Sequence, residues 1–457
     1  MQVTDLRPLG DLDRAQLLAA MPRAEMGTQE ATELVQPIME AVRKDGAKAL
    51  REFSERFDKV CYQPLRVPQS AMDEALENID PKLRAAIEES VRRMRAVCAT
   101  QVPEDFHTDI APGARVSQRW IPVERVGLYV PGGKAVYPTS VIMNAVPAQV
   151  AGVESLAIAT PPSVDNNGLP ASSILATCAI LGVKEVYAVG GAQAVAMFAY
   201  GALEEDGTVL CDPVDKITGP GNIFVATAKS LVSHMVGIDS VAGPSEIAII
   251  ADCTANPEWL AADLIGQAEH DELAGSVLIT DDEQLAQKVQ DSLAYRVPRT
   301  LNSERVRIAL EGSQSRIIIT TGIEQSIKAA NAYAAEHLEV VCENVDEVIA
   351  KIRNAGAIFR GAYSPVPLGD YMSGSNHVLP TSGTARFSAG LGVHTFMKPV
   401  EVIEYDEQGL KDLAARINTF AEYENLPAHG ECVLSRFIDD PYNKQTLEEQ
   451  EQQAGLL

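Results

Sequence analysis

The sequence lacks a long apolar run, a paired-cysteine motif and an excess of positive charge. No stretch of its 457 residues approaches the roughly 18 apolar residues that a membrane-spanning helix needs. The first residues, MQVTDLRPLGDLDRAQLL, contain no basic segment followed by an apolar segment, as a secretory signal would. From these absences we expect the protein to be cytoplasmic.

The charge and the cysteines exclude further classes of protein. The formal net charge is -25 at pH 7, and a negative surface repels phosphate groups. General binding to nucleic acid or to an anionic membrane is therefore not expected. The seven cysteines are scattered, with no CxxC pair and no even framework. We interpret them as buried or unreactive thiols.

The two ends of the chain are predicted to be helical. Residues 1–120 are expected to be mainly helical and to pack on the catalytic unit. One of their helices should cover DPKLRAAIEESVRRMRAVC, with Asp80 as N-cap and Pro81 in the first helical position. No strand is expected after about residue 395. The helices of 395–457 cannot form a large core alone, so we expect them to pack on something else.

Between the ends, short apolar runs of β type alternate with helical stretches. Such alternation predicts an α/β fold with parallel sheets and right-handed crossovers. We expect two Rossmann-like units, over 121–243 and 244–394, which a duplication would explain, although no residue-level repeat supports one. The predicted strands are GLYV, LAIAT and VYAVG in the first unit, and IAIIA, VLIT, RIIIT and AIF in the second.

Three glycine-bearing loops precede predicted helices in the first unit. They are PGGK (131–134), VGGAQ (189–193) and GPGN (219–222). Glycine lets a ligand approach the backbone, and a helix N-terminus offers free N–H groups to an anion such as pyrophosphate. One such loop is weak support, because any α/β protein needs glycine turns, but three favour a nucleotide site. The GxGxxG dinucleotide fingerprint is absent.

The few histidines suggest a metal site with mixed ligands. In DLIGQAEHDE, Gln267 and His270 lie three residues apart, so a helix would place both on one face. Asp370 and His429 are candidates to complete four-coordination. The alternative stays open, because Gln is a poor zinc ligand and an isolated His270 is more often a hydrogen-bonded structural residue.

Other histidines carry weaker signals. His377 shares a glycine-rich stretch with Asp370, where a ligand-contacting loop and a plain turn are both compatible with the sequence. His107, His234 and His394 are expected to make only local hydrogen bonds.

The stretch NAYAAEHLEVV contains the adjacent pair Glu336 and His337. Neighbours on a helix point about 100° apart, so a helix would not place these two side chains to pair with each other. Two readings remain open. The residues are two proton acceptors with different targets, or they are the end of a helix at which His gains from the dipole and Glu is exposed.

Long segments of the sequence, in matching order, resemble histidinol dehydrogenase. The resemblance covers most of residues 120–432. It implies oxidation of L-histidinol to L-histidine in two NAD-dependent steps with a bound zinc ion, the last reaction of histidine biosynthesis. The matching segments are ERVGLYVPGGKAVYPTSVIMNAVPAQVAGV, GGAQAVAMFAYG, VDKITGPGNIFVATAK, IDSVAGPSEIAIIAD, QAEHDE, NAYAAEHLEVV and GAIFRGAYSPVPLGDYMSGSNHVLPTSGTARFSAGLGV.

The resemblance also implies roles for individual residues. His337 would accept the alcohol proton, and Glu336 the proton of the water that attacks the aldehyde. The implied zinc ligands are Gln267, His270, Asp370 and His429. The implied NAD contacts are Tyr129, Gln193 and Asn222. The implied substrate contacts are Ser245, Gln267, His270, His337, Asp370, His377, Glu424 and His429.

The resemblance further implies a domain-swapped homodimer. The C-terminal helices would complete the partner's site, so Glu424 and His429 would act in the other subunit. This chain differs from shorter family members by an extension after about Asp439. Two rival functions remain at this point: a related dehydrogenase that oxidises another small alcohol to an acid, and a zinc hydrolase in which Glu336 activates water. The hydrolase would leave the three glycine loops unexplained.

Overall fold

The computed structural model describes residues 1–10, 13–24, 27–60, 64–132, 135–438 and 452. The chain forms two compact units. Unit 1 consists of Met1–Val102 and Val123–Phe396, and unit 2 of Pro103–Pro122 and Met397–Leu457. The boundaries expected at 120 and 394 therefore shift, because a segment from each side of the α/β region joins unit 2.

One sheet of unit 1 has six strands, and every neighbouring pair is parallel. Its order is β1 (Gln2–Asp5), β13 (Arg316–Ile319), β12 (Gly275–Thr280), β11 (Glu246–Ala251), β14 (His337–Val341) and β15 (Ala357–Arg360). The edge strand β1 comes from the region expected to be mainly helical. Its pairing with β13 supplies the backbone hydrogen bonds that a short polar segment cannot make alone.

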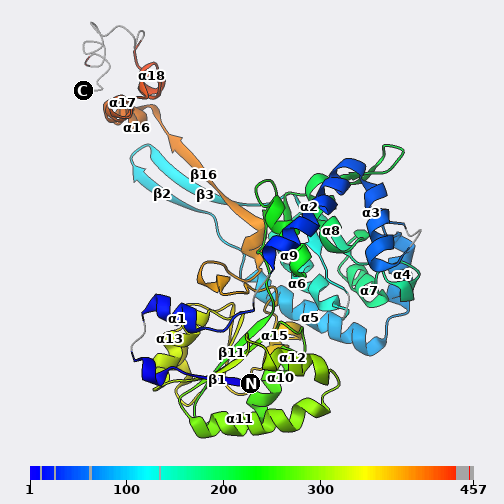
Figure 1. Cartoon of the computed structure of the whole chain (residues 1–457). Coiled ribbons are helices and arrows are strands. Elements are labelled where there is room, and N and C mark those ends of the chain that lie inside the picture. The colour runs from blue at the N-terminus through cyan, green and yellow to red at the C-terminus, as the bar shows by residue number, and fades with distance from the viewer. Residues whose placement is uncertain (11–12, 25–26, 61–63, 133–134, 439–451, 453–457) are drawn as a thin grey trace. The chain divides into compact units, whose positions relative to one another are not determined.

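Helices cover both faces of this sheet, as the apolar strands require. Figure 1 shows them around the sheet, and their buried side chains form a separate core on each face. One face carries α10 (Pro257–Ala268), α11 (Glu283–Arg296) and α12 (Ser303–Glu311). The other carries α1 (Arg14–Ala20), α13 (Ile323–Tyr333) and α14 (Val345–Ile349).

The second sheet of unit 1 has five parallel strands. Its order is β10 (Gly237–Ile238), β9 (Lys216–Thr218), β4 (Arg125–Tyr129), β5 (Ser155–Thr160) and β6 (Glu185–Ala188). The expected α/β class with parallel sheets is thus confirmed. The duplication stays a prediction.

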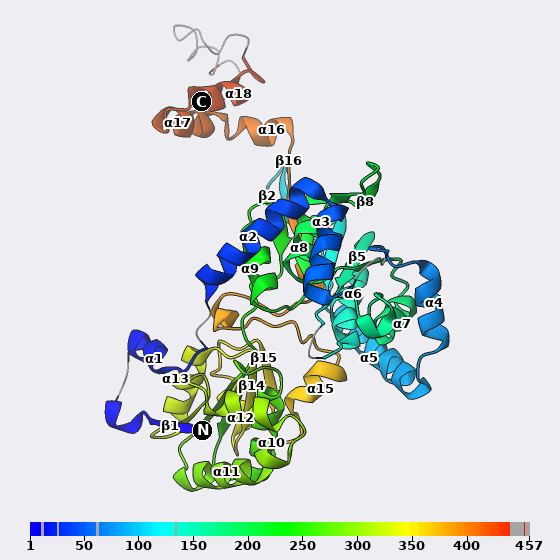
Figure 2. The same cartoon turned by 45° about the vertical axis from the view of Figure 1, so that its right-hand side comes forward.

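Helices also flank the five-stranded sheet. Figure 2 shows α2, α3, α8 and α9 grouped together, and their buried residues form one core. These helices are α2 (Thr28–Asp45), α3 (Ala47–Phe53), α8 (Gly191–Tyr200) and α9 (Ile223–Val232). A further packed group consists of α4 (Gln69–Glu77), α5 (Pro81–Ala99), α6 (Pro138–Ala151) and α7 (Ser172–Ile180). In α5 the side chain of Asp80 accepts from the amides of Lys82 and Leu83, which confirms the predicted cap.

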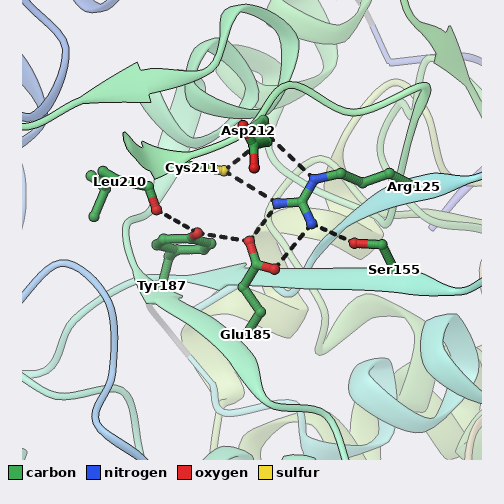
Figure 3. Close-up of polar contacts among 7 residues, drawn as sticks. All are labelled: Arg125, Ser155, Glu185, Tyr187, Leu210, Cys211 and Asp212. Carbon is green, nitrogen blue, oxygen red and sulfur yellow. Dashed lines mark hydrogen bonds and ion pairs between the residues drawn. The ribbon is translucent and has the colours of Figure 1, made fainter. Parts of the chain in front are cut away.

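A partly buried ionic network links the amino ends of three strands of this sheet (Figure 3). Arg125 begins β4, Ser155 begins β5 and Glu185 begins β6. The Arg125 guanidinium forms an ion pair with Glu185 and donates to Ser155 Oγ at 2.5 Å. The Tyr187 hydroxyl lies 2.7 Å from Glu185. These four side chains provide hydrogen-bond partners for one another at the edge of the sheet opposite to the glycine loops.

Unit 2 combines a three-stranded antiparallel sheet with three helices. The sheet order is β16 (Met397–Tyr405), β3 (Ala114–Pro122) and β2 (Phe106–Ala111), and the helices are α16 (Glu407–Lys411), α17 (Ala414–Tyr423) and α18 (Pro427–Leu434). The prediction of no strand after residue 395 was wrong. In β16 the alternating polar and apolar residues include Pro399 and are mostly exposed, so the sequence offers no buried run, and pairing with β3 stabilises the strand.

Short elements complete the described chain. They are the strands β7 (Ala202–Leu203) and β8 (Val209–Cys211), the helix α15 (Val366–Tyr371), and the single turns η1 (Arg7–Leu9), η2 (Ser54–Asp58), η3 (Val164–Asn166), η4 (Val297–Arg299), η5 (Thr384–Arg386) and η6 (Val393–Phe396). Among the described residues, no helix combines the length and the apolar character needed to span a membrane.

Candidate active site

The three glycine loops follow the carboxyl ends of three strands of the five-stranded parallel sheet. PGGK follows β4, VGGAQ follows β6 and GPGN follows β9. Parallel strands present these ends at one edge of a sheet, the usual place for a ligand in such folds. Gly133 and Lys134 of PGGK lie outside the described residues. Asn222 is the N-cap of α9, and its side chain accepts from the amides of Phe224 and Val225.

Tyr129 joins two of these loops. It ends β4 and is 3% exposed, and its hydroxyl accepts from the Gly191 amide at 3.1 Å. Its carbonyl oxygen faces Gly219, where an added Cβ would lie 2.0 Å away, and Gly219 has a φ of +117°. Only glycine fits there. Burial raises the pKa of Tyr129 to about 12, so its hydroxyl stays protonated. Gln193 is buried in α8 beside the same loop.

The pair Glu336 and His337 does not lie on a helix. Helix α13 ends at Tyr333, Ala334 adopts a left-handed conformation with φ +49°, and His337 begins β14. The reading of a helix end is therefore wrong. The β-type residues HLEVV pair on both sides within the six-stranded sheet, which outweighs the helical preference of the preceding alanines. Glu336 Oε2 lies 3.6 Å from His337 Nδ1, closer than a helix would allow.

The backbone of Glu246 holds both members of the pair. The Glu246 amide donates to Glu336 Oε2 at 2.9 Å. The Glu246 carbonyl lies 3.1 Å from His337 Nδ1, and because a carbonyl only accepts, Nδ1 carries the proton. The lone pair is then on Nε2, which is buried and has no hydrogen-bond partner among the described residues. His337 is thus oriented as a proton acceptor.

Burial sets the charge of both side chains. It raises the pKa of Glu336 well above the ordinary value, and the nearby acids Glu246 and Asp370 raise it further. Burial lowers the pKa of His337 to about 3, so the imidazole is neutral at physiological pH. A neutral imidazole can accept a proton, whereas an imidazolium cannot.

The side chain of Glu246 is itself anchored. Arg23 forms an ion pair with it and hydrogen-bonds the Tyr333 carbonyl. The Arg23 guanidinium lies 4.4 Å from the centre of the Tyr333 ring. A cavity of about 210 Å³ adjoins these three side chains. Sequence reasoning missed Glu246, although a glutamate opening the apolar strand IAIIA is a signal of a special role.

Three of the proposed zinc ligands lie in unit 1. Gln267 is in the last turn of α10, and both polar atoms of its amide are buried without a hydrogen-bond partner in the described chain. His270 lies beyond the end of α10, so the helical spacing expected for the two residues was wrong; its amide donates to the Gln267 carbonyl at 3.2 Å. Burial lowers the pKa of His270 and raises the pKa of Asp370 to about 6.

These residues suit a zinc ion chemically. A neutral imidazole, a carboxylate and an amide oxygen are oxygen and nitrogen donors that zinc accepts, and an unpartnered buried amide needs a partner. No three His, Cys, Asp or Glu side chains among the described residues are arranged to hold a metal. The proposed set differs from such a group, since it contains Gln267 and takes His429 from unit 2.

Glu424 and His429 lie in unit 2. Glu424 is the C-cap of α17 and His429 is in α18, and both are exposed. Unit 1 therefore does not by itself bring together all the residues that sequence analysis selected. His107, His234 and His394 are also exposed, and their purely local role stays a prediction.

His377 is held on both ring nitrogens. Its Nδ1 lies 3.3 Å from the Asp370 carbonyl and so carries the proton, and its Nε2 accepts from the Ser140 hydroxyl at 3.1 Å. Ser140 is linked through its carbonyl to Asn144, which also accepts from Thr218, the residue before the GPGN loop. This series of hydrogen bonds links α15 through α6 to β9, and sequence analysis missed Ser140 and Asn144. Ser245 precedes β11, next to Glu246.

Unit 1 thus combines a buried acid, a neutral imidazole and three glycine loops in one α/β fold, an arrangement typical of an enzyme. The sequence model of the family described as "Histidinol dehydrogenase" matches residues 21–437. Histidinol dehydrogenase of Bifidobacterium longum is 73% identical over 460 residues, which cover 100% of this chain and 98% of the relative. That of Corynebacterium efficiens is 54% identical over 437 residues, covering 96% of each.

A solved structure agrees with this match. The crystal structure of histidinol dehydrogenase from Elizabethkingia anophelis is 33% identical, with a TM-score of 0.88, and covers 95% of this chain and 98% of its own. The chain therefore belongs to the histidinol dehydrogenase family of oxidoreductases.

Proposed function

We propose that the protein oxidises L-histidinol to L-histidine through bound L-histidinal, with NAD as the electron acceptor and zinc as the metal, as the last step of histidine biosynthesis. The family membership supports the substrate. One observation carries the chemistry: a buried acid and a neutral imidazole are fixed side by side by the two backbone groups of Glu246. The two oxidations need two proton acceptors at one bound carbon.

In the first oxidation, His337 is the proton acceptor. Its unpartnered Nε2 takes the proton of the alcohol as hydride leaves the carbon for NAD, which gives the aldehyde and the reduced cofactor. The proton on Nδ1 stays bonded to the Glu246 carbonyl and keeps the ring in this orientation.

In the second oxidation, Glu336 is the proton acceptor. It removes a proton from the water that attacks the aldehyde, and the hydrate then loses a second hydride to NAD to give the acid. The raised pKa of Glu336 makes its carboxylate a stronger base than an exposed one. The ionised form requires a cation nearby, which bound zinc would supply.

The candidate ligands divide into three groups. Tyr129, Gln193 and Asn222 stand beside the glycine loops and would contact NAD. Ser245 and His377, with Glu424 of a partner subunit, would contact the substrate. Gln267, His270 and Asp370 would hold zinc. When bound, zinc would fix the substrate nitrogens and reduce the free energy needed to ionise the buried acids. The fourth ligand would be His429 of a partner subunit.

A domain-swapped homodimer follows from this assignment. The buried apolar cluster that the described part of unit 2 contains is small and consists of Ala414, Leu434 and Ile438. Unit 2 leaves large apolar side chains such as Phe420 and Tyr423 exposed, at 68% and 89%. Such exposure favours a contact with another protein surface, and we propose that a second copy of the chain supplies it. A cytoplasmic location stays a prediction.

The direct test is an assay of cofactor reduction with purified protein, L-histidinol and NAD. Two reduced cofactors should form for each histidinol consumed. A related dehydrogenase would prefer another alcohol, and a zinc hydrolase would reduce no cofactor. Chelation should stop the reaction and leave circular dichroism unchanged, because the apolar cores beside both sheets do not include the proposed metal ligands. Full activity in verified metal-free protein would refute the metal assignment.

The swap is tested by complementation. His429→Ala and His337→Ala proteins should each be inactive. After subunit exchange, each mixed dimer would contain one site without either substitution, so part of the activity should return. If exchange is verified and no activity returns, His429 acts within its own chain.

A further inference from the structure

A deeply buried ion pair in unit 1 lies next to the GPGN loop. Lys229, in α9, and Asp239, after β10, form an ion pair with side chains 1% and 5% exposed. The remaining hydrogen-bonding capacity of both groups is directed at the backbone. Ion pairs this deeply buried are seldom net stabilisers, because desolvation of the charges offsets their attraction. Their placement is therefore more informative than their contribution to stability.

Both partners hold the same residue. Asp239 Oδ2 accepts from the Gly219 amide at 2.8 Å, and Lys229 Nζ donates to the Gly219 carbonyl at 3.0 Å. Asp239 also accepts from the Ser240 amide at 2.7 Å. The two peptide groups that flank the α-carbon of Gly219 are thus fixed by opposite charges.

Gly219 in turn lies against Tyr129. Gly219 has a positive φ, and the Tyr129 carbonyl lies close to its α-carbon. A movement of the Gly219 backbone toward Tyr129 would therefore cause a steric clash. The Tyr129 hydroxyl accepts from Gly191 of the VGGAQ loop. A shift at Gly219 would consequently displace the GPGN loop relative to the other loop of the proposed NAD site.

We propose that the Lys229–Asp239 ion pair is a positioning element of the NAD site, which fixes the GPGN loop against Tyr129. The inference rests on the proposed function, because it presumes that NAD binds at the glycine loops. Neither side chain is a catalytic residue, since each acts through Gly219. Loss of the pair should weaken binding of NAD and leave binding of histidinol intact.

The test removes both charges together. Lys229→Met with Asp239→Asn leaves no unpaired buried charge and keeps an acceptor for the Gly219 amide. It removes the donor to the Gly219 carbonyl and relaxes the geometry. We expect KM for NAD and the calorimetric Kd for NAD to rise about tenfold, as for loss of one or two hydrogen bonds. KM for histidinol and kcat should change less than about twofold, a split that general loosening would not produce.

The matched control is Glu185→Gln, which weakens the Arg125 network at the opposite ends of strands in the same sheet (Figure 3). It should lower Tm without changing KM for NAD. Should the double variant fail to fold, Lys229→Gln with Asp239→Asn keeps a donor at position 229, leaves no unpaired charge and should raise KM for NAD a few-fold. Unchanged KM and Kd for NAD in a folded variant would overturn the inference. If the wild-type protein does not use NAD, the proposed function fails instead.

Discussion

The two sheets of unit 1 differ in how far their buried charge is paired. In the five-stranded sheet and its helices, Arg125 pairs with Glu185 and Lys229 pairs with Asp239. In and beside the six-stranded sheet, Arg23 pairs with Glu246. Burial there raises the pKa of Glu336, Glu339 and Asp370, and no cation among the described residues lowers any of these three pKa values. The Gln267 amide and His337 Nε2 there also lack hydrogen-bond partners in the described chain.

The difference distinguishes buried polar groups that stabilise the fold from buried polar groups that serve function. A buried polar group that finds its partner within the chain holds the fold together, whereas one without a partner lowers stability. Several such groups near Glu336 lack partners within the described chain, which is typical of a ligand-binding site. Substrate, zinc and a partner subunit, as proposed, would supply them.

The largest expected effect comes from Glu336→Gln. The amide keeps an acceptor for the Glu246 amide but cannot take a proton, so oxidation of supplied histidinal should slow by ~10²–10⁴-fold. A single turnover from histidinol should still yield some reduced cofactor. The Tm of the metal-free variant should equal or exceed that of the wild type, because a neutral group replaces a buried acid.

The opposite outcome is expected from Glu185→Gln. This substitution removes the negative charge that pairs with Arg125, whose side chain is 15% exposed. The free energy of unfolding should fall by about 2 kcal/mol, less than for a fully buried pair, while kcat stays unchanged. Urea denaturation and the NAD assay measure the two quantities. If both variants lose activity and stability alike, the contrast between the sheets has no functional meaning.

Sequence patterns predicted the architecture but not this contrast. Hydrophobic period and glycine placement predicted the parallel α/β units, the sequence singled out the pair Glu336 and His337, and the family resemblance implied Tyr129. The ionic pairs were not predictable, because Arg125 and Glu185 are 60 residues apart and meet only after the strands align. Strand β14 was not predicted, for a similar reason. Its pairing with β11 and β15, and not the helical preference of the preceding residues, decides the conformation at His337.

The C-terminal region shows a second limit of local patterns. Strand β16 is exposed, contains a proline and pairs with β3, which lies far away in the sequence. No buried run marks such a strand. The small core of the helices that follow it was predictable, because their sequences contain few apolar residues that could meet.

A pH-dependent effect of intermediate size should come from Glu339. Burial and the neighbouring Asp263 raise its pKa to about 9, so the folded state keeps a proton that the unfolded chain loses above about 4.5. Stability from this group is therefore lost as pH rises toward 9. Above roughly pH 6.5, where the histidines no longer contribute, the unfolding free energy should fall by up to about 1.4 kcal/mol per pH unit.

Glu339→Gln should reduce this slope, and the part that comes from the raised pKa of Glu336 should remain. Denaturation of metal-free protein, from roughly pH 7 to the pKa of about 9, measures it. The exposed Glu347, on α14 in the same part of unit 1, provides the control, and Glu347→Gln should retain the wild-type slope. Equal slopes in all three proteins would mean that Glu339 does not hold a proton in this range, and the contrast in charge pairing would be smaller than the structure indicates.

The smallest expected effect is that of Tyr129→Phe. The substitution removes the hydroxyl that accepts from the Gly191 amide and leaves the ring and the backbone that faces Gly219 in place. One neutral hydrogen bond contributes about 0.5–1.5 kcal/mol, so KM for NAD should rise a few-fold while KM for histidinol stays constant. Because the pKa of Tyr129 is raised to about 12, the ratio between variant and wild type should not change with pH across the assay range. A collapse of kcat would instead place the hydroxyl in the chemistry, and no change in KM for NAD would mean that NAD binding does not depend on the link between the two loops.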